Sequence, residues 1–190
     1  PELARFRHWL EIQRLYRPHL LTEPEEKILA EKAVTGRRAW DRFFDEIHSA
    51  ARYQLDGEEL SADRVLSKLH VADRDLRRRA AEVFTEGLHA MRRSTSYVFN
   101  MILADKASDD RLRQFPTWIS SRNLSNEVDD ATVQALVDAV TSRYDIVARY
   151  YRLKARLLGF DELFDYDRYA PLPAADRFYP WAEARRIVLD

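Results

Sequence analysis

One uninterrupted helical pattern constrains this chain more than any other feature. From Asp73 to about Asp105, apolar residues recur at spacings of three and four for about eight turns. A stripe of that length needs neighbours, because a helix buries its apolar face only by packing against another element. We therefore expect a mainly α, multi-helical fold with long antiparallel helices. The stripe consists of Leu76, Ala80, Val83, Phe84, Leu88, Met91, Thr95, Val98, Phe99, Ile102 and Leu103.

Three shorter helices are predicted ahead of this one. The first covers residues 2–16 and ends before Pro18. The second begins after Thr22, where Glu25 completes a capping box, and we expect it to end at Gly36 in a left-handed cap. The third carries one aromatic and aliphatic stripe, formed by Trp40, Phe43, Phe44 and Ile47.

A change of period predicts one small β-hairpin near residues 53–60. Asp56-Gly57 separates two short arms and suits a two-residue turn, since glycine accepts a positive φ. Ser61 then caps a short helix.

Beyond the long helix, we expect a connection over residues 107–125 that contains Pro116. Asp129 or Asp130 caps a second long helix that runs to Gly159. An aromatic, non-helical crossing over residues 161–180 leads to a last helix. We place a domain boundary in the connection over residues 107–125. It separates an N-terminal helical lobe, residues 1–118, from a truncated second domain, residues 119–190.

Composition excludes several classes of function. There is no cysteine, which removes disulfide scaffolds, thiol catalysis and thiolate metal sites. The 31 Lys and Arg residues are balanced by 32 Asp and Glu residues, which argues against a nucleic-acid binder. No uncharged run approaches the roughly 18 to 20 residues of a membrane span, and early charges argue against a signal peptide. A cytoplasmic setting fits best.

The start at Pro1 and the uncapped last helix lead us to expect a piece of a longer protein.

The five histidines do not form a zinc-protease motif. The closest two, His8 and His19, lie eleven residues apart, whereas such a motif needs two histidines four apart. Glu86 and His89 have the Glu-x-x-His spacing of di-iron bundles, but no second copy exists and both lie opposite the apolar stripe. We interpret them as a solvated helix face. An independent di-iron enzyme would contain bound iron, and we expect neither iron nor zinc to bind this chain stoichiometrically.

Other candidate groups also have plain structural interpretations. Arg77-Arg78-Arg79 and Arg92-Arg93 could bind phosphate, but we interpret them as a solvated face balanced by Glu82 and Glu86. The serines have no Gly-x-Ser-x-Gly elbow around them. Trp40, Trp118 and Trp181 could line a peptide groove, but such residues more often fill helix–helix interfaces. No catalytic, cofactor-binding or metal-binding residue is therefore assigned. The serines considered are Ser94, Ser96, Ser120 and Ser121.

Two stretches carry a family resemblance. The first covers residues 20–29 and 36–45, and the second covers residues 150–159 and 165–172. Between them, in order, stand residues 56–60, 77–81, 97–100 and 105–106. Taken together, nearly the whole chain resembles the oligoendopeptidase F family of zinc metalloendopeptidases, which are related to thimet oligopeptidase.

The resemblance implies a helical, two-lobed cytoplasmic oligopeptidase around a deep channel. In that family a His-Glu-x-x-His helix and a later Glu bind zinc, and this sequence contains no such motif. It implies no cofactor in this chain, zinc in the parent protein, and a non-catalytic role as one wall of the channel for short peptides. The implied partners are the rest of the parent peptidase and, in the full-length protein, short peptides.

Two further expectations stay open at the sequence level. The alternative function is a stand-alone helical interaction module without catalysis. If the chain is a cut domain, apolar surface would be exposed and could drive homodimerisation. We place that surface around Tyr166, Tyr169, Phe178 and Trp181.

Overall fold

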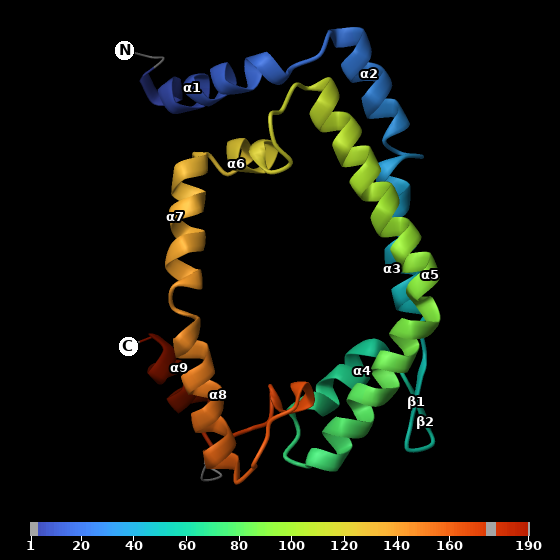
Figure 1. Cartoon of the computed structure of the whole chain (residues 1–190), viewed down its shortest axis with the longest axis vertical. Helices are drawn as coiled ribbons and strands as arrows, with labels where there is room; N and C mark the ends of the chain where they lie inside the picture. The colour runs from blue at the N-terminus through green and yellow to red at the C-terminus, as the bar shows by residue number, and fades with distance from the viewer. Residues whose placement is uncertain (1–3, 174–177, 190) are drawn as a thin grey trace.

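The chain folds into two helical walls that are joined at both ends (Figure 1). The computed structural model describes residues 4–173 and 178–189. The first wall consists of α3 (Arg37–Ala50) and α5 (Arg74–Leu112), and the second of α7 (Asp130–Thr141) and α8 (Tyr144–Leu158). In the described ranges, no ribbon crosses the space between the walls (Figure 1). The mainly α fold with one hairpin is confirmed.

The N-terminal helices lie at the end of the walls where α5 finishes (Figure 1). They are η1 (Ala4–Phe6), α1 (Arg7–Tyr16), η2 (Arg17–His19) and α2 (Glu23–Lys32). The predicted capping box is present, since the Glu25 carboxylate accepts hydrogen bonds from the backbone N–H and the hydroxyl of Thr22.

The predicted left-handed cap at Gly36 is wrong. Its φ is −95° and its ψ −121°, and it stands immediately before α3 as the N-cap residue. Space explains the glycine better than φ does, because a Cβ there would lie 3.1 Å from the carbonyl oxygen of Lys32.

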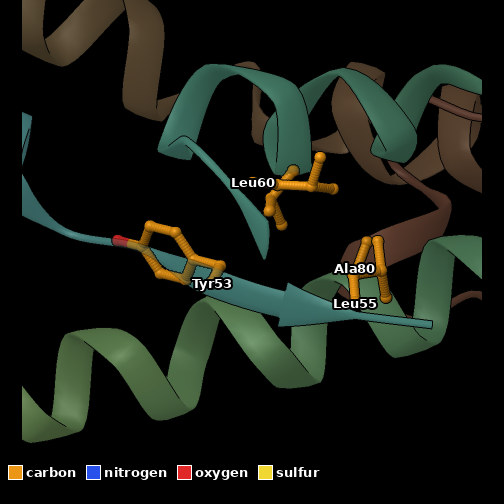
Figure 2. Close-up of a cluster of buried hydrophobic side chains, with 5 residues drawn as sticks. Tyr53, Leu55, Leu60 and Ala80 are labelled. Carbon is orange, nitrogen blue, oxygen red and sulfur yellow. The ribbon is translucent and has the colours of Figure 1, made fainter. Parts of the chain in front are cut away.

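The buried apolar core lies beside the first half of α5. Strands β1 (Tyr53–Leu55) and β2 (Glu58–Leu60) pair antiparallel, with Tyr53 opposite Leu60. Asp56 and Gly57 have φ values of 53° and 85°, as the predicted two-residue turn requires. Helices α4 (Ala62–Ser67) and η3 (Lys68–His70) close the other side. Figure 2 shows the hairpin side chains between these elements and α5; the buried cluster is Tyr53, Leu55, Leu60, Val65 and Ala80.

Helix α5 begins as predicted, because the Asp73 carboxylate accepts hydrogen bonds from the N–H groups of Asp75 and Leu76. It ends later than predicted. The residues expected in a connection extend it by two turns to Leu112, and they are joined by ion pairs four residues apart, Lys106–Asp110 and Asp109–Arg113. Pro116 follows the helix, and a further short helix, α6 (Ser120–Ser125), was also missed.

The predicted helix from Asp129 to Gly159 is two helices. Asp129 caps α7 and Gly159, with a φ of 69°, caps α8, as expected. Between them, the hydroxyls of Thr141 and Ser142 donate to the carbonyls of Val137 and Ala139. Such bonds back onto the preceding turn bend helices, and they explain the break at this point.

The last described elements are η4 (Asp165–Asp167) and α9 (Trp181–Leu189). Element η4 lies within the aromatic crossing, which returns from the second wall toward the start of α5, and α9 follows it (Figure 1). Part of that crossing, residues 174–177, lies outside the described residues, and so does Asp190. Within the described ranges, no helix combines the length and the apolarity needed to cross a membrane.

Candidate functional site: a buried ionic junction

A buried ion cluster joins the start of the first wall to the end of the second. Asp167 of η4 has no exposed surface, and Arg77 of α5 is 1% exposed. The Arg77 guanidinium donates to Oδ1 of Asp167 over 2.7 Å, although ninety positions separate the two residues. We call the set Arg74, Arg77, Lys154 and Asp167 the clasp.

Arg77 is saturated by acceptors from the same region. Besides Asp167, its nitrogens donate to the backbone carbonyls of Val71 and Ala72 at 2.8 Å each and of Tyr166 at 3.2 Å. A buried guanidinium is tolerated only when its donors are met in this way. The interpretation of Arg77 as part of a solvated face is therefore wrong.

Arg74 completes the carboxylate's partners from one helical turn away. Its Nε lies 3.2 Å from each carboxylate oxygen of Asp167. Its Nη2 lies 2.8 Å from Oδ2 of Asp167 and 2.8 Å from the carbonyl oxygen of Glu162. Its guanidinium also lies 4.0 Å from the ring centre of Phe160. Asp167 thus has two arginine partners, and the N–H of Phe164 donates to it as well.

Burial and hydrogen bonding act in opposite directions on the pKa of Asp167. Burial alone would raise that pKa, because it disfavours the charged carboxylate. The hydrogen bonds from Arg74 and Arg77, with that from the Phe164 N–H, outweigh burial, so that the pKa lies below its ordinary value. Asp167 is therefore an ionised, fully bonded anchor at neutral pH.

Lys154 of α8 is the second buried cation near Asp167. It is 4% exposed, and its Nζ donates to the carbonyl oxygen of Arg168 at 2.7 Å. Burial lowers the pKa of Lys154, the positive charge of Arg77 lowers it further, and the negative charge of Asp167 opposes both. His70 of η3 and Tyr169 stack nearby with ring centres 4.7 Å apart. Residues from α5, η3, α8 and η4 therefore meet at this one junction.

A second ionic junction holds the opposite end of the first wall. The Arg113 guanidinium contacts both carboxylate oxygens of Glu26, at 2.6 and 2.9 Å, and Oδ1 of Asp109 at 2.9 Å. The hydrogen bonds from Arg113 lower the pKa of Glu26 to about 2, and the N–H of Leu21 contributes. His19 donates from Nδ1 to the carbonyl oxygen of Arg113 and stacks on Phe115. This junction fixes α2 against the C-terminal end of α5.

The candidate metal residues lie apart from both junctions. Glu86 and His89 are exposed on α5, as the helical spacing predicted. Across the described part of the chain, no three residues of the His, Cys, Asp and Glu types come close enough together to hold a metal ion. The residues present therefore do not fit the zinc site that the resemblance places in the parent protein.

The remaining candidates have ordinary surroundings. On the surface, Arg78 pairs with Glu82, as expected, and also with Asp75. Arg79 pairs with Asp56 of the hairpin turn. Ser121 accepts a hydrogen bond from Lys106.

Of the three tryptophans considered above, Trp40 meets the interface expectation through an edge contact with Tyr97. Trp118 and Trp181 are 77% and 80% exposed. Phe178 is also exposed, whereas Tyr166 of the same predicted patch is half-buried against Phe164.

Sequence reasoning missed the clasp although a signal was present. Arg77 stands three residues before Ala80 in the α5 stripe, and Lys154 stands between Tyr151 and Leu158 in the α8 stripe. A charged residue in an apolar stripe indicates a buried, partnered charge. Asp167 has no comparable signal, because its segment has no helical period.

Solved structures share this two-walled fold. A crystal structure of a Chlamydophila abortus protein superposes with a TM-score of 0.85 over 99% of this chain and 32% of that one, at 22% identity. The crystal structure of oligoendopeptidase-F from Enterococcus faecium gives a TM-score of 0.79 over 92% of this chain and 36% of that chain, also at 22% identity.

Sequence comparisons indicate the same family. The oligopeptidase F family model matches residues 1–53. Group B oligopeptidase PepB of Streptococcus agalactiae is 22% identical over 97% of this chain and 32% of its own length. The oligoendopeptidase F homolog of Borreliella burgdorferi is 23% identical over 81% of this chain and 26% of its own length. The resemblance to the oligoendopeptidase F family is confirmed, and the chain spans a third or less of these relatives.

Proposed function

We propose that this chain is the non-catalytic N-terminal portion of a zinc oligoendopeptidase and forms one side of its peptide channel. The similarity to oligopeptidases along most of this chain, but only part of theirs, supports the proposal. The proposed partners are the rest of that peptidase and short peptides in the complete enzyme, in the cytoplasm.

The observation that carries this proposal is the amount of exposed surface. The accessible surface is 15386 Å², whereas a compact monomer of 22.4 kDa exposes about 9,400 Å². The excess, about 6,000 Å², is several times the roughly 800 Å² that each partner contributes to a standard interface. Much of it is apolar, including Leu136, Tyr144 and Val147 on the second wall. A large body that packs against the walls would cover such a surface.

The proposed division of labour follows from what a hydrolytic metal site needs. Bound zinc supplies a polarised water and a Lewis acid, and the cavity around it must be shaped and shielded. The described residues provide no zinc ligands, so this chain contributes shape. Long helical walls would admit short, unfolded peptides and exclude folded proteins by size.

Hydrolysis of a fluorogenic nine-residue peptide tests the proposal. The 190-residue chain and the protein from the full reading frame of its gene are assayed side by side, each with and without a chelator. We expect turnover only from the longer protein, its loss with the chelator, and its return with zinc. Intact folded protein offered as substrate should be spared. Chelator-resistant turnover by the 190-residue chain, or rapid cleavage of the folded protein, would contradict the proposal.

A further inference from the structure

The end of α5 divides the chain into two halves, each of which contains one wall. Long-range contacts between these halves are concentrated at two places. One lies at the covalent connection after α5, where Lys106 donates to Ser121 and His8 contacts Glu127. The other is the clasp, where Arg77 and Asp167 meet across ninety positions of sequence. In Figure 1 these places lie at opposite ends of the two walls. At the first, the backbone itself joins the walls; at the second, side chains and backbone carbonyls from both halves do so.

The chemistry of the clasp suits a part that must hold one geometry. Asp167 accepts from both arginines and from the Phe164 N–H, and Arg77 reaches three carbonyls at once. Planar guanidinium forks impose direction as well as attraction. Separating the halves would take both arginines away from the buried Asp167 and the carboxylate away from Arg77, and an ion pair broken in this way is strongly unfavourable.

We propose that Asp167 is a positioning residue that, through Arg74 and Arg77, fixes the spacing between the two helical walls. The contact closes the end of the structure that the backbone leaves open. One consequence rests on the proposed function: in the complete peptidase, the same contact would set the width available to a peptide. The clasp itself does not depend on peptidase activity.

The spacing can be measured directly, because the chain contains no cysteine and accepts spin labels at chosen sites. Arg93 on α5 and Arg149 on α8 are exposed and stand on opposite walls. With both replaced by labelled cysteine, pulsed electron paramagnetic resonance gives the distribution of distances between the walls. Asp167→Asn keeps the side-chain shape and removes the charge that both arginines face.

A matched control is available on the same helix. Arg79 of α5 makes a two-bond contact with Asp56 at 3.0 and 2.9 Å, but both residues belong to the first half of the chain and both are partly exposed. Asp56→Asn therefore removes an Arg–Asp pair without touching the clasp. Arg74→Gln is a milder clasp variant, since the Arg74 side chain is 33% exposed and Arg77 stays in place. Circular dichroism reports whether each variant keeps its helices.

We expect Asp167→Asn to shift the mean distance by more than about 2 Å, the size that separates a rearrangement from a side-chain adjustment, and to broaden the distribution. Arg74→Gln should produce a smaller shift in the same direction, and Asp56→Asn none. If Asp167→Asn loses its helices, Arg74→Gln decides the question. An unchanged distribution in the folded clasp variants would overturn the proposal. Because no substrate is involved, that result would leave the proposed function standing.

Discussion

The hairpin region and the second wall both carry apolar side chains but place them in opposite environments. Around the hairpin, Tyr53, Leu55, Leu60 and Val65 are each no more than 4% exposed. On the described helices α7 and α8, most of the large apolar side chains are exposed, and the one buried side chain is that of Lys154. An amphipathic helix therefore does not guarantee a core: the hairpin region supplies its own partner, whereas the second wall presents a face without one.

The most sensitive test of this difference is to truncate a leucine to alanine in each of the two regions. Leu60→Ala removes a side chain that is 3% exposed, and Leu136→Ala removes one that is 64% exposed. We expect Leu60→Ala to lower the free energy of unfolding by about 2–5 kcal/mol and Leu136→Ala by less than about 0.5 kcal/mol. Chemical denaturation monitored by circular dichroism measures both. Equal losses would mean that the second wall has a core of its own.

A glycine in the middle of α5 offers a second test of the hairpin core. A Cβ at Gly87 would lie 2.3 Å from Cε1 of Tyr53, whose ring is buried and stacked on Phe84. Alanine favours helices over glycine, but the overlap should dominate, and we expect Gly87→Ala to destabilise by about 1–3 kcal/mol.

The exposed neighbour Glu86 provides the control for this test. Glu86→Ala changes the same turn of α5 without approaching Tyr53 and should leave thermal unfolding nearly unchanged. If the Gly87→Ala variant were more stable than the unmodified 190-residue chain, the Tyr53 ring would have to move aside freely.

Local chemistry made much of this fold predictable. The Thr22–Glu25 capping box, the Asp56-Gly57 turn, the start of α5 near Asp73 and the Gly159 cap depend on residues close in sequence, and each was found as expected. The resemblance added the family.

The predictions were wrong where the structure depends on contacts between distant residues, or on side chains that compete with the helix for its carbonyls. The break after Thr141 depends on hydroxyls that compete for carbonyls inside an otherwise regular apolar pattern. The burial of Arg77 depends on Asp167, ninety positions away, and no spacing rule connects them. The boundary between residues 118 and 119 stays a prediction.

Acid should weaken the ionic junctions that join the regions, with a smaller effect than core deletion. The pKa of Asp167 lies below its ordinary value and that of Glu26 is lowered to about 2. A carboxylate with a lowered folded pKa stabilises fully above its unfolded pKa, and that contribution is lost as the pH falls through the folded pKa. We therefore expect the melting temperature to be flat near neutrality and to fall below about pH 4.

The same titration on Asp167→Asn isolates the clasp. This variant should start from a lower melting temperature and lose less on acidification, because the group that titrates is gone. Equal acid sensitivity in the two proteins would assign the effect to other carboxylates.

Hydrogen exchange of the backbone amides, measured by mass spectrometry on the 190-residue chain and on the protein from the full reading frame, tests the central claim most directly. The account predicts that amides of α7 and α8 exchange much more slowly in the longer protein, where the rest of the peptidase covers the second wall. Amides of the hairpin and the adjoining part of α5, which already have a core, should change little. Equal exchange of α7 and α8 in the two proteins would contradict the claim that this wall is a surface for the rest of the peptidase.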